Sequence, residues 1–243
     1  KIPNLEVRLE TELFEETEKI KYSLTQTKMG NFINKMAKLS KTYKSGKPLY
    51  YLAIFYKEGQ IPESVRRGIN GYLSIDTKID DKRSILDFLG SSSVEVDDDE
   101  DIINEPITDE KRYKEAIKES ANLLYEPAVA EYVILLLDNG TDTEENKIKE
   151  ATDLLNKFFN TFRCLNDYSR IRIQHARAKL LEINGKRQNN QELVKNALRL
   201  YKEAADGGLV AGVADYLRLY NESDDKNDIL IKYYQKRLDN FNK

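Results

Sequence analysis

The stretch Ala197–Tyr220, ALRLYKEAADGGLVAGVADYLRLY, has the pattern of two short helices joined by a glycine turn. Small residues at Ala204, Ala205 and Gly212 stand where the two helices would touch. Aromatic side chains such as Tyr220 stand where they would fill the space around that contact. The stretch therefore predicts a closely packed helix pair, which is a unit that can be repeated along a chain.

The spacing of these residues resembles a Sel1-like repeat, a relative of the tetratricopeptide repeat. In that family an alanine precedes an Ala-Ala pair by seven residues. The pair is followed by a glycine, a small residue, the motif Leu-Gly-x-x-Tyr and a closing glycine. The positions that match are Ala197, Ala204, Ala205, Gly208, Gly212 and Tyr220. Tyr216 and Leu217 stand where the family has Leu-Gly, which predicts a wider spacing of this helix pair.

The same frame recurs earlier in the chain. In residues 120–140, Ser120-Ala121 takes the place of the alanine pair, Ala128 is the small contact residue and Gly140 closes the repeat. Residues 52–59 match the end of a second helix, and a more eroded copy runs over residues 151–185. The resemblance thus covers most of residues 40–225.

The closing glycines give the period of the repeat. Gly140 and Gly185 are 45 residues apart, and Gly59 and Gly140 are 81 residues apart, close to two such periods. Self-similarity at a fixed period of about 20–50 residues is typical of solenoids. We therefore predict an all-α fold, a right-handed α-solenoid of antiparallel helix pairs. The alternative is an ordinary helical bundle whose helices end in glycine, which is a common C-cap.

The predicted organisation is one helical-repeat domain over residues 1–243, with an acidic inserted loop at 91–108 and a C-terminal capping helix within 226–243. Helices are expected from hydrophobic spacing, caps and breakers. Their ranges are 5–24, 27–43, 49–57, 61–73, 85–89, 110–121, 127–138, 146–162, 168–184, 190–205, 210–220 and 229–241.

Three local features refine this outline. The helix at 127–138 is apolar nearly all round, so we expect it at the centre of the core. Thr141 or Thr143 is expected to form a capping box with the acids that follow, and Thr108 with its neighbouring acids to cap the helix after it. The tyrosines on the repeat frame are expected to pack between helices. They are Tyr56, Tyr132, Tyr201 and Tyr220.

Composition excludes several classes of function. With 39 basic and 42 acidic residues the net charge is −3, which gives no electrostatic basis for binding nucleic acid. No apolar run is long enough for membrane insertion, and no secretory segment opens the chain. The single cysteine, Cys164, cannot form an internal disulfide, so the compartment, cytoplasmic or periplasmic/lumenal, stays open. Lys1 in place of a methionine is compatible with a removed leader or upstream domain.

No catalytic constellation is apparent, so we expect a protein that is not an enzyme and has no cofactor and no metal. His175 lies beside Arg172, Arg177 and Lys179, and we expect it on the surface of a basic helix face. Metal ligation needs several converging Cys, His or acidic side chains, and Cys164 has no second thiol.

The resemblance implies a non-catalytic adaptor that binds a partner protein or peptide on the concave face of the solenoid, lined by the first helix of each pair. The candidate residues are exposed polar side chains of those helices: Lys114, Lys118, Asp153, Asn156, Lys195, Arg199 and Lys202. The last three share one helix face and could clamp an acidic or carboxyl-terminated segment. The alternative is that this face is simply solvated.

A second hypothesis is a dedicated inhibitor, such as an immunity protein, that tightly blocks one basic toxin or enzyme. The acidic run Asp97–Asp101 would then contact the target. The alternative for this run is a solvated loop, because densely packed like charges repel each other.

Overall fold

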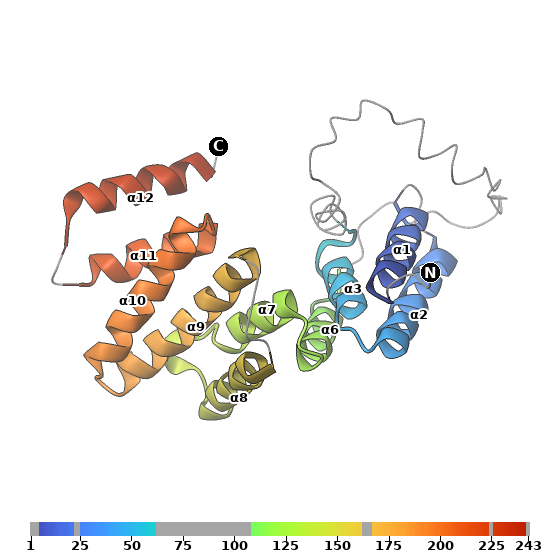
Figure 1. Ribbon diagram of the computed structural model, residues 1–243, viewed down its shortest axis with the longest axis horizontal. Helices are drawn as coiled ribbons and strands as arrows, with labels where there is room; N and C mark the ends of the chain where they lie inside the picture. Colours follow the sequence, from blue (N-terminus) through green and yellow to red (C-terminus); the bar gives the residue numbers. More distant parts are fainter. Residues whose placement is uncertain (1–4, 22–24, 62–107, 162–166, 224–225, 242–243) are drawn as a thin grey trace. The chain divides into compact units, whose positions relative to one another are not determined.

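Figure 1 shows the computed structural model, which describes residues 5–21, 25–61, 108–161, 167–223 and 226–241. Within these ranges every regular element is helical and no β-strand occurs, so the prediction of an all-α fold is confirmed. The elements are α1 (Leu5–Lys19), α2 (Gln26–Tyr43), α3 (Lys47–Glu58), α6 (Glu110–Asn122), α7 (Glu126–Leu136), the 3-10 turn η1 (Gly140–Asp142), α8 (Glu145–Thr161), α9 (Asp167–Arg187), α10 (Gln191–Asp206), α11 (Val210–Asn221) and α12 (Asp228–Phe241).

The chain forms two compact units, Lys1–Tyr113 and Lys114–Lys243, and each is described by itself. Several predicted features lie outside the described residues. They are the helices at 61–73 and 85–89, nearly all of the acidic loop at 91–108, and Cys164. The single-domain organisation stays a prediction.

In the first unit, α2 packs against both α1 and α3. The hydroxyl of Thr25 accepts a hydrogen bond from the Lys28 backbone N–H and caps the start of α2. Helix α3 ends at Gly59, whose φ of 72° is the left-handed conformation that glycine adopts without strain, as predicted. All nine residues from Pro48 to Tyr56 are buried, so α3 is enclosed on every side.

The start of α6 is capped by Asp109, one of the acids that were predicted to cap it together with Thr108. The Asp109 carboxylate accepts a hydrogen bond from the backbone N–H of Arg112 at 3.0 Å. The Asp109 backbone N–H donates to the carbonyl of Tyr56 at 2.8 Å, which ties this cap to α3 within the first unit. A carboxylate in the first turn also interacts favourably with the positive end of the helix.

In the second unit, helices pack mainly against near neighbours in the chain. Helix α7 packs against α8 and α9, α9 packs against α10, α10 against α11, and α11 against α12. The inner residues of α7 are buried, as expected of a central helix: Ala128, Val129, Ala130, Tyr132, Val133 and Leu136. Tyr56, Tyr132, Tyr201 and Tyr220 are also buried, in agreement with a packing role.

Glycine permits the close contact between α10 and α11. A Cβ atom built on Gly212 would lie 2.8 Å from the Cβ of Ala204 and 3.0 Å from the backbone N of Ala205, closer than real Cβ contacts. The small residues of the motif therefore do meet where the sequence predicted. The wider spacing expected from Tyr216 and Leu217 is not seen at this contact.

The role predicted for Gly185 was wrong. Helix α9 continues through Gly185 to Arg187, so this glycine does not close the helix. A Cβ at Gly185 would lie 2.8 Å from Cγ2 of Val194 on α10, so the missing side chain serves packing instead. The chain turns at Asn189, whose φ is 50°. Asn190 then caps α10 by accepting from two backbone N–H groups.

The capping box predicted before α8 is replaced by a different arrangement. The Thr143 hydroxyl donates to the carbonyl of Gly140 at 2.7 Å. Arg187 of α9 donates to the carbonyls of Thr141 and Thr143 at 3.0 and 2.6 Å, and pairs with Glu145. An arginine distant in sequence thus fixes the connection between α7 and α8, and local sequence spacing does not reveal it.

Candidate functional site

The predicted basic face of α10 is exposed, but two of its three cations are paired within their own helix. Arg199 pairs with Glu203, and Nζ of Lys202 lies 2.7 Å from Oδ2 of Asp206. Lys195 is exposed beside them. Because these i,i+4 pairs neutralise much of the positive charge, the face resembles the solvated alternative more than a ready-made anion clamp.

Lys202 also takes part in the attachment of α12. Its partner Asp206 accepts a hydrogen bond from the Tyr234 hydroxyl, and the Asp206 carbonyl accepts one from Arg237 at 3.4 Å. Burial, together with the bond to Asp206, raises the pKa of Tyr234 to about 12. The Tyr234 ring contacts Tyr216 of α11, with ring centroids 4.7 Å apart. Reversing the charge of Lys202 would therefore disturb the fold as well as the surface.

The other predicted residues lie on α6 and α8. Lys114 and Lys118 are exposed on α6, and Asn156 is exposed on α8. Nζ of Lys118 lies 2.9 Å from Oε1 of Glu150 on α8, and the Tyr132 hydroxyl of α7 donates to the same oxygen at 2.8 Å. Three helices thus meet at one carboxylate.

A hollow of about 380 Å³ opens beside this carboxylate. We call it the α6–α8 hollow, and its lining residues are Asn122, Tyr132, Asn146, Lys149, Glu150, Asp153, Leu154 and Lys157. Asp153 was predicted, and Lys118 contributes through its pair with Glu150. Lys114 and Asn156 are not among the lining residues. The remaining predicted residues, Lys195, Arg199 and Lys202, lie on α10, so the predicted residues fall on two surfaces.

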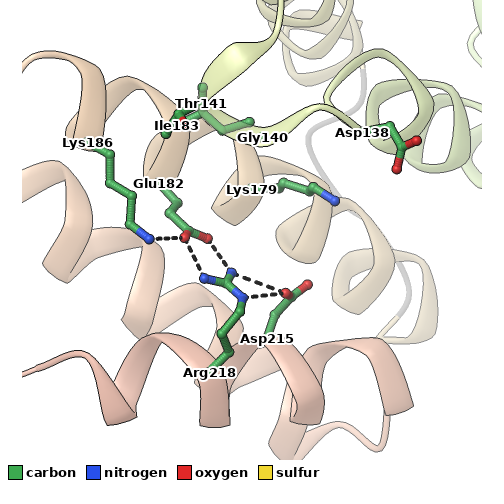
Figure 2. Close-up of a pocket in the computed structure, with 9 residues that line it drawn as sticks. All are labelled: Asp138, Gly140, Thr141, Lys179, Glu182, Ile183, Lys186, Asp215 and Arg218. Carbon is green, nitrogen blue, oxygen red and sulfur yellow. Dashed lines mark hydrogen bonds and ion pairs between the residues drawn. The ribbon is translucent and has the colours of Figure 1, made fainter.

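A buried ion cluster between α9, α10 and α11 was missed by the sequence analysis (Figure 2). Glu182 of α9 is only 6% exposed. Arg218 of α11 donates to both of its carboxylate oxygens at 2.7 Å, a bidentate geometry. Lys186 approaches Oε1 at 2.9 Å, and the Tyr201 hydroxyl of α10 donates to Oε2 at 2.9 Å. Every helix of this part of the unit therefore supplies a group to Glu182.

Asp215 extends the same cluster. Nε2 of His175 lies 2.9 Å from Oδ2 of Asp215, and Arg218 lies 3.2 Å from the other oxygen, Oδ1. Lys186 reaches Glu222 at 2.7 Å. We call these residues, together with Glu182 and Tyr201, the α9–α11 ion cluster. The expectation of a surface histidine was wrong, because His175 is 7% exposed and packs against the Tyr201 ring.

The cluster keeps its carboxylates ionised despite burial. Burial alone would raise the pKa of Glu182, but hydrogen bonds from Arg218 and Lys186 lower it, and the net pKa is below its ordinary value. The pKa of Asp215 is lowered in the same way, with burial opposed by His175 and Arg218. Burial raises the pKa of Tyr201, so its hydroxyl keeps its proton and stays a donor.

A pocket of about 280 Å³ lies against the cluster. Its lining residues are Asp138, Gly140, Thr141, Lys179, Glu182, Ile183, Lys186, Asp215 and Arg218. Three of these side chains are acidic and three are basic, so their charges balance. Figure 2 shows Glu182, Lys186, Arg218 and Asp215 joined to one another by hydrogen bonds and ion pairs. The pocket therefore offers no excess charge to an ionic ligand, and the geometry is that of a structural tie between helices.

The ion pairs of this cluster that lie within one helix could have been predicted from the sequence. Glu182 and Lys186, and Asp215 and Arg218, have the spacings of helical ion pairs. The contacts that matter run between helices, such as Arg218 to Glu182, 36 residues apart. No periodicity argument pairs those two residues.

Comparison of the chain with family models, with curated proteins and with solved structures finds no match. The Sel1-like resemblance therefore rests on the residues quoted above. In the parts of the chain that the structure describes, no group of three or more His, Cys, Asp or Glu side chains could hold a metal ion. Among those same residues, no helix combines the length and apolar character required to cross a bilayer.

Proposed function

We propose that this chain is a non-catalytic scaffold that binds a partner protein or peptide, and that the α6–α8 hollow is part of the binding surface. The observation that carries the proposal is the hollow itself, which brings polar side chains from α6, α7 and α8 around a partly apolar floor. Concave sites with a few convergent polar groups are the usual places for recognition.

The proposed architecture behind this surface is a solenoid of helix pairs. Two observations support it: packing in the second unit runs mainly between helices close in sequence, and small residues meet at Gly212 and Ala204. In such an arrangement α6 and α8 are first helices of successive pairs, and first helices line the concave face in proteins similar to Sel1-like repeats. The Lys118–Glu150 pair already joins these two helices.

The chemistry of the hollow favours an acidic segment of the partner. Lys149 and Lys157 are exposed on its wall, while buried Leu154 and Tyr132 form its floor. Glu150 is neutralised by Lys118, which leaves Asp153 as the opposing charge. A partner with an apolar anchor next to a carboxylate fits this combination. The α10 face is the poorer candidate because Arg199 and Lys202 are already paired.

Affinity capture with three forms of the full chain tests the proposal. The hollow variant carries Lys149→Glu with Lys157→Glu, and the matched control carries Lys195→Glu on α10. These exposed changes should alter the free energy of unfolding by no more than about 0.5 kcal/mol each. We expect one partner to be recovered by the parent and the control, and to be lost by the hollow variant through charge repulsion.

A partner that is retained by the hollow variant and lost by the α10 control would place the binding surface on α10 instead. A photo-crosslinking side chain at Asp153 supplies an independent readout. We expect it to link to the partner recovered by the parent, and a crosslink only from position 195 would contradict the proposal.

A further inference from the structure

The dipeptide Asn-Gly occurs in two different environments in the described residues. Asn139-Gly140 lies in the connection between α7 and α8, and Asn184-Gly185 lies inside α9. A further copy, Asn70-Gly71, falls outside the described residues. Asparagine is among the chemically labile residues of proteins, and a glycine after it gives the backbone the greatest freedom to rotate. The two described copies differ only in how firmly the fold holds them.

The side chain of Asn139 and the peptide bond after it are held weakly. Asn139 is exposed, and its side chain forms no capping hydrogen bond at the start of η1. A Cβ atom built on Gly140 would have nothing within 4 Å. The Gly140 backbone N–H donates to the carbonyl of Leu137 at 3.1 Å. Thr143 and Arg187 bond to backbone carbonyls of this connection, so they hold neither that nitrogen nor the Asn139 side chain.

The peptide bond after Asn184 is fixed by the fold. The Asn184 carbonyl accepts a hydrogen bond from Gln188 at 3.0 Å, and the Gly185 carbonyl accepts one from Asn190 at 2.8 Å. A Cβ atom built on Gly185 would lie 2.8 Å from Cγ2 of Val194, so the backbone packs directly against α10. Rotation of this peptide bond would break both the end of α9 and its contact with α10.

We propose that Asn139 is a site of spontaneous deamidation in the folded chain, and that the fold protects Asn184 from the same reaction. The Gly140 amide nitrogen loses its proton to solvent hydroxide and attacks Cγ of Asn139. An N–Cγ bond forms, the Cγ–Nδ2 bond breaks, and ammonia leaves with a proton taken from water. Water then opens the cyclic imide at either of its carbonyls, which gives aspartate or isoaspartate at position 139. The reaction consumes only water.

Either product would alter the connection that leads into α8. Both add a negative charge beside Asp138 and Asp142, since carboxyl groups are ionised at neutral pH. Isoaspartate also lengthens the backbone directly before Gly140, whose carbonyl accepts from the Thr143 hydroxyl at 2.7 Å. Helix α8, which begins soon after, carries most of the residues that line the α6–α8 hollow. We therefore expect deamidation to loosen the start of α8. Asn139 does not line the hollow, so the reaction can be observed whether or not the hollow binds a partner.

Peptide mapping by mass spectrometry tests this proposal on the full chain. The chain is incubated in mildly alkaline buffer, with and without guanidinium chloride. In the folded chain the peptide with Asn139 should convert progressively to aspartate and isoaspartate forms, while the peptide with Asn184 stays unchanged. In guanidinium both should convert, because both backbones are then free to rotate. The variant Asn139→Ser assigns the signal, since its peptide should stay unchanged, and circular dichroism checks that the incubated chain keeps its helicity.

Protection of Asn139 in the folded chain, with conversion in guanidinium, would overturn the proposal, because the fold would then hold this turn as well. Equal conversion at Asn139 and Asn184 in the folded chain would also overturn it, because the environments would then not differ in effect. Hydrogen–deuterium exchange of the converted chain tests the consequence. Exchange in residues 140–147 should be faster than in fresh chain, and unchanged exchange there would contradict the loosening of α8.

Discussion

The second unit contains two clusters of charged side chains that differ in what surrounds them. In the α9–α11 ion cluster, buried Glu182 receives donors from Arg218, Lys186 and Tyr201. In the α6–α8 hollow, Lys149 and Asp153 face solvent. The same residue types thus hold helices together in the α9–α11 ion cluster and form a solvent-exposed surface in the α6–α8 hollow. Burial decides between these roles, because an ionised group inside a protein must be paired.

The comparison also explains why ionisable groups alone are a poor guide to function in this chain. The deepest polar residues, Glu182 and His175, are the ones that a search for unusual ionisable groups would select. Their partners are all supplied by the protein itself. In the hollow, Lys149 and Asp153 are open to solvent, and this accessibility is what suits it to binding.

The largest expected effect comes from breaking the buried pair. Arg218→Met removes the bidentate partner of Glu182 and leaves a buried carboxylate with only Lys186 and Tyr201. Loss of one partner of a buried pair destabilises proteins by about 3–5 kcal/mol, and we expect about 2 kcal/mol here because the Arg218 side chain is 44% exposed and two donors to Glu182 remain. Urea unfolding followed by circular dichroism measures it.

The matched control for this change is Lys149→Met in the hollow. It removes an exposed cation, and its effect should stay within about 0.5 kcal/mol. Equal urea midpoints for Arg218→Met and the parent would show that the ion cluster does not stabilise the unit.

A smaller effect should follow from closing the space between α10 and α11 next to the cluster. Alanine normally stabilises a helix by about 1 kcal/mol relative to glycine. At Gly212 the added Cβ would overlap Ala204, so we expect Gly212→Ala to destabilise by about 1–2 kcal/mol. Gly30 of α2 has nothing within 4 Å of such a Cβ, so Gly30→Ala should stabilise. If Gly212→Ala stabilises the chain in thermal unfolding, as Gly30→Ala should, the close contact is contradicted.

Much of the fold could be predicted because it depends on local chemistry. The glycine at Gly59 and the apolar run in α7 each act within a few residues, and both were placed correctly. The small residues Ala204 and Gly212 were predicted to meet because a repeat frame relates them. The role of Gly185 was predicted wrongly, because glycine occurs both at the ends of helices and inside helices that pack closely.

The candidate sites were harder to predict because they depend on contacts between helices. Lys118 of α6 and Glu150 of α8 are brought together by the fold, and no spacing in the sequence pairs them. His175 and Asp215 lie 40 residues apart, so the neighbours of His175 in sequence suggested a basic surface instead. The arginine that holds the α7–α8 connection, Arg187, was missed for the same reason.

Acid should weaken the ion cluster, with a smaller effect than the substitutions above. The pKa values of Glu182 and Asp215 in the folded chain lie below their ordinary values of 4.5 and 3.8. The unfolded chain therefore binds more protons, so the stability from these groups is present above those values and is lost as the pH falls below them.

Urea midpoints at about pH 5 and about pH 3 measure this loss, in the range where carboxyl groups titrate. The midpoint of the parent should fall over this range, and that of Glu182→Gln, which has one such group fewer, should fall by less. Equal decreases in the two proteins would show that Glu182 does not contribute a lowered pKa to folding.

The central claim is that the α6–α8 hollow binds the partner and that the α9–α11 ion cluster only stabilises the fold. Hydrogen–deuterium exchange tests this claim most directly, when the full chain is compared free and bound to its captured partner. We predict that the partner slows exchange in residues 146–157 of α8 and leaves residues 175–186 of α9 unchanged. Protection confined to residues 195–206 of α10, with no change in α8, would contradict the account.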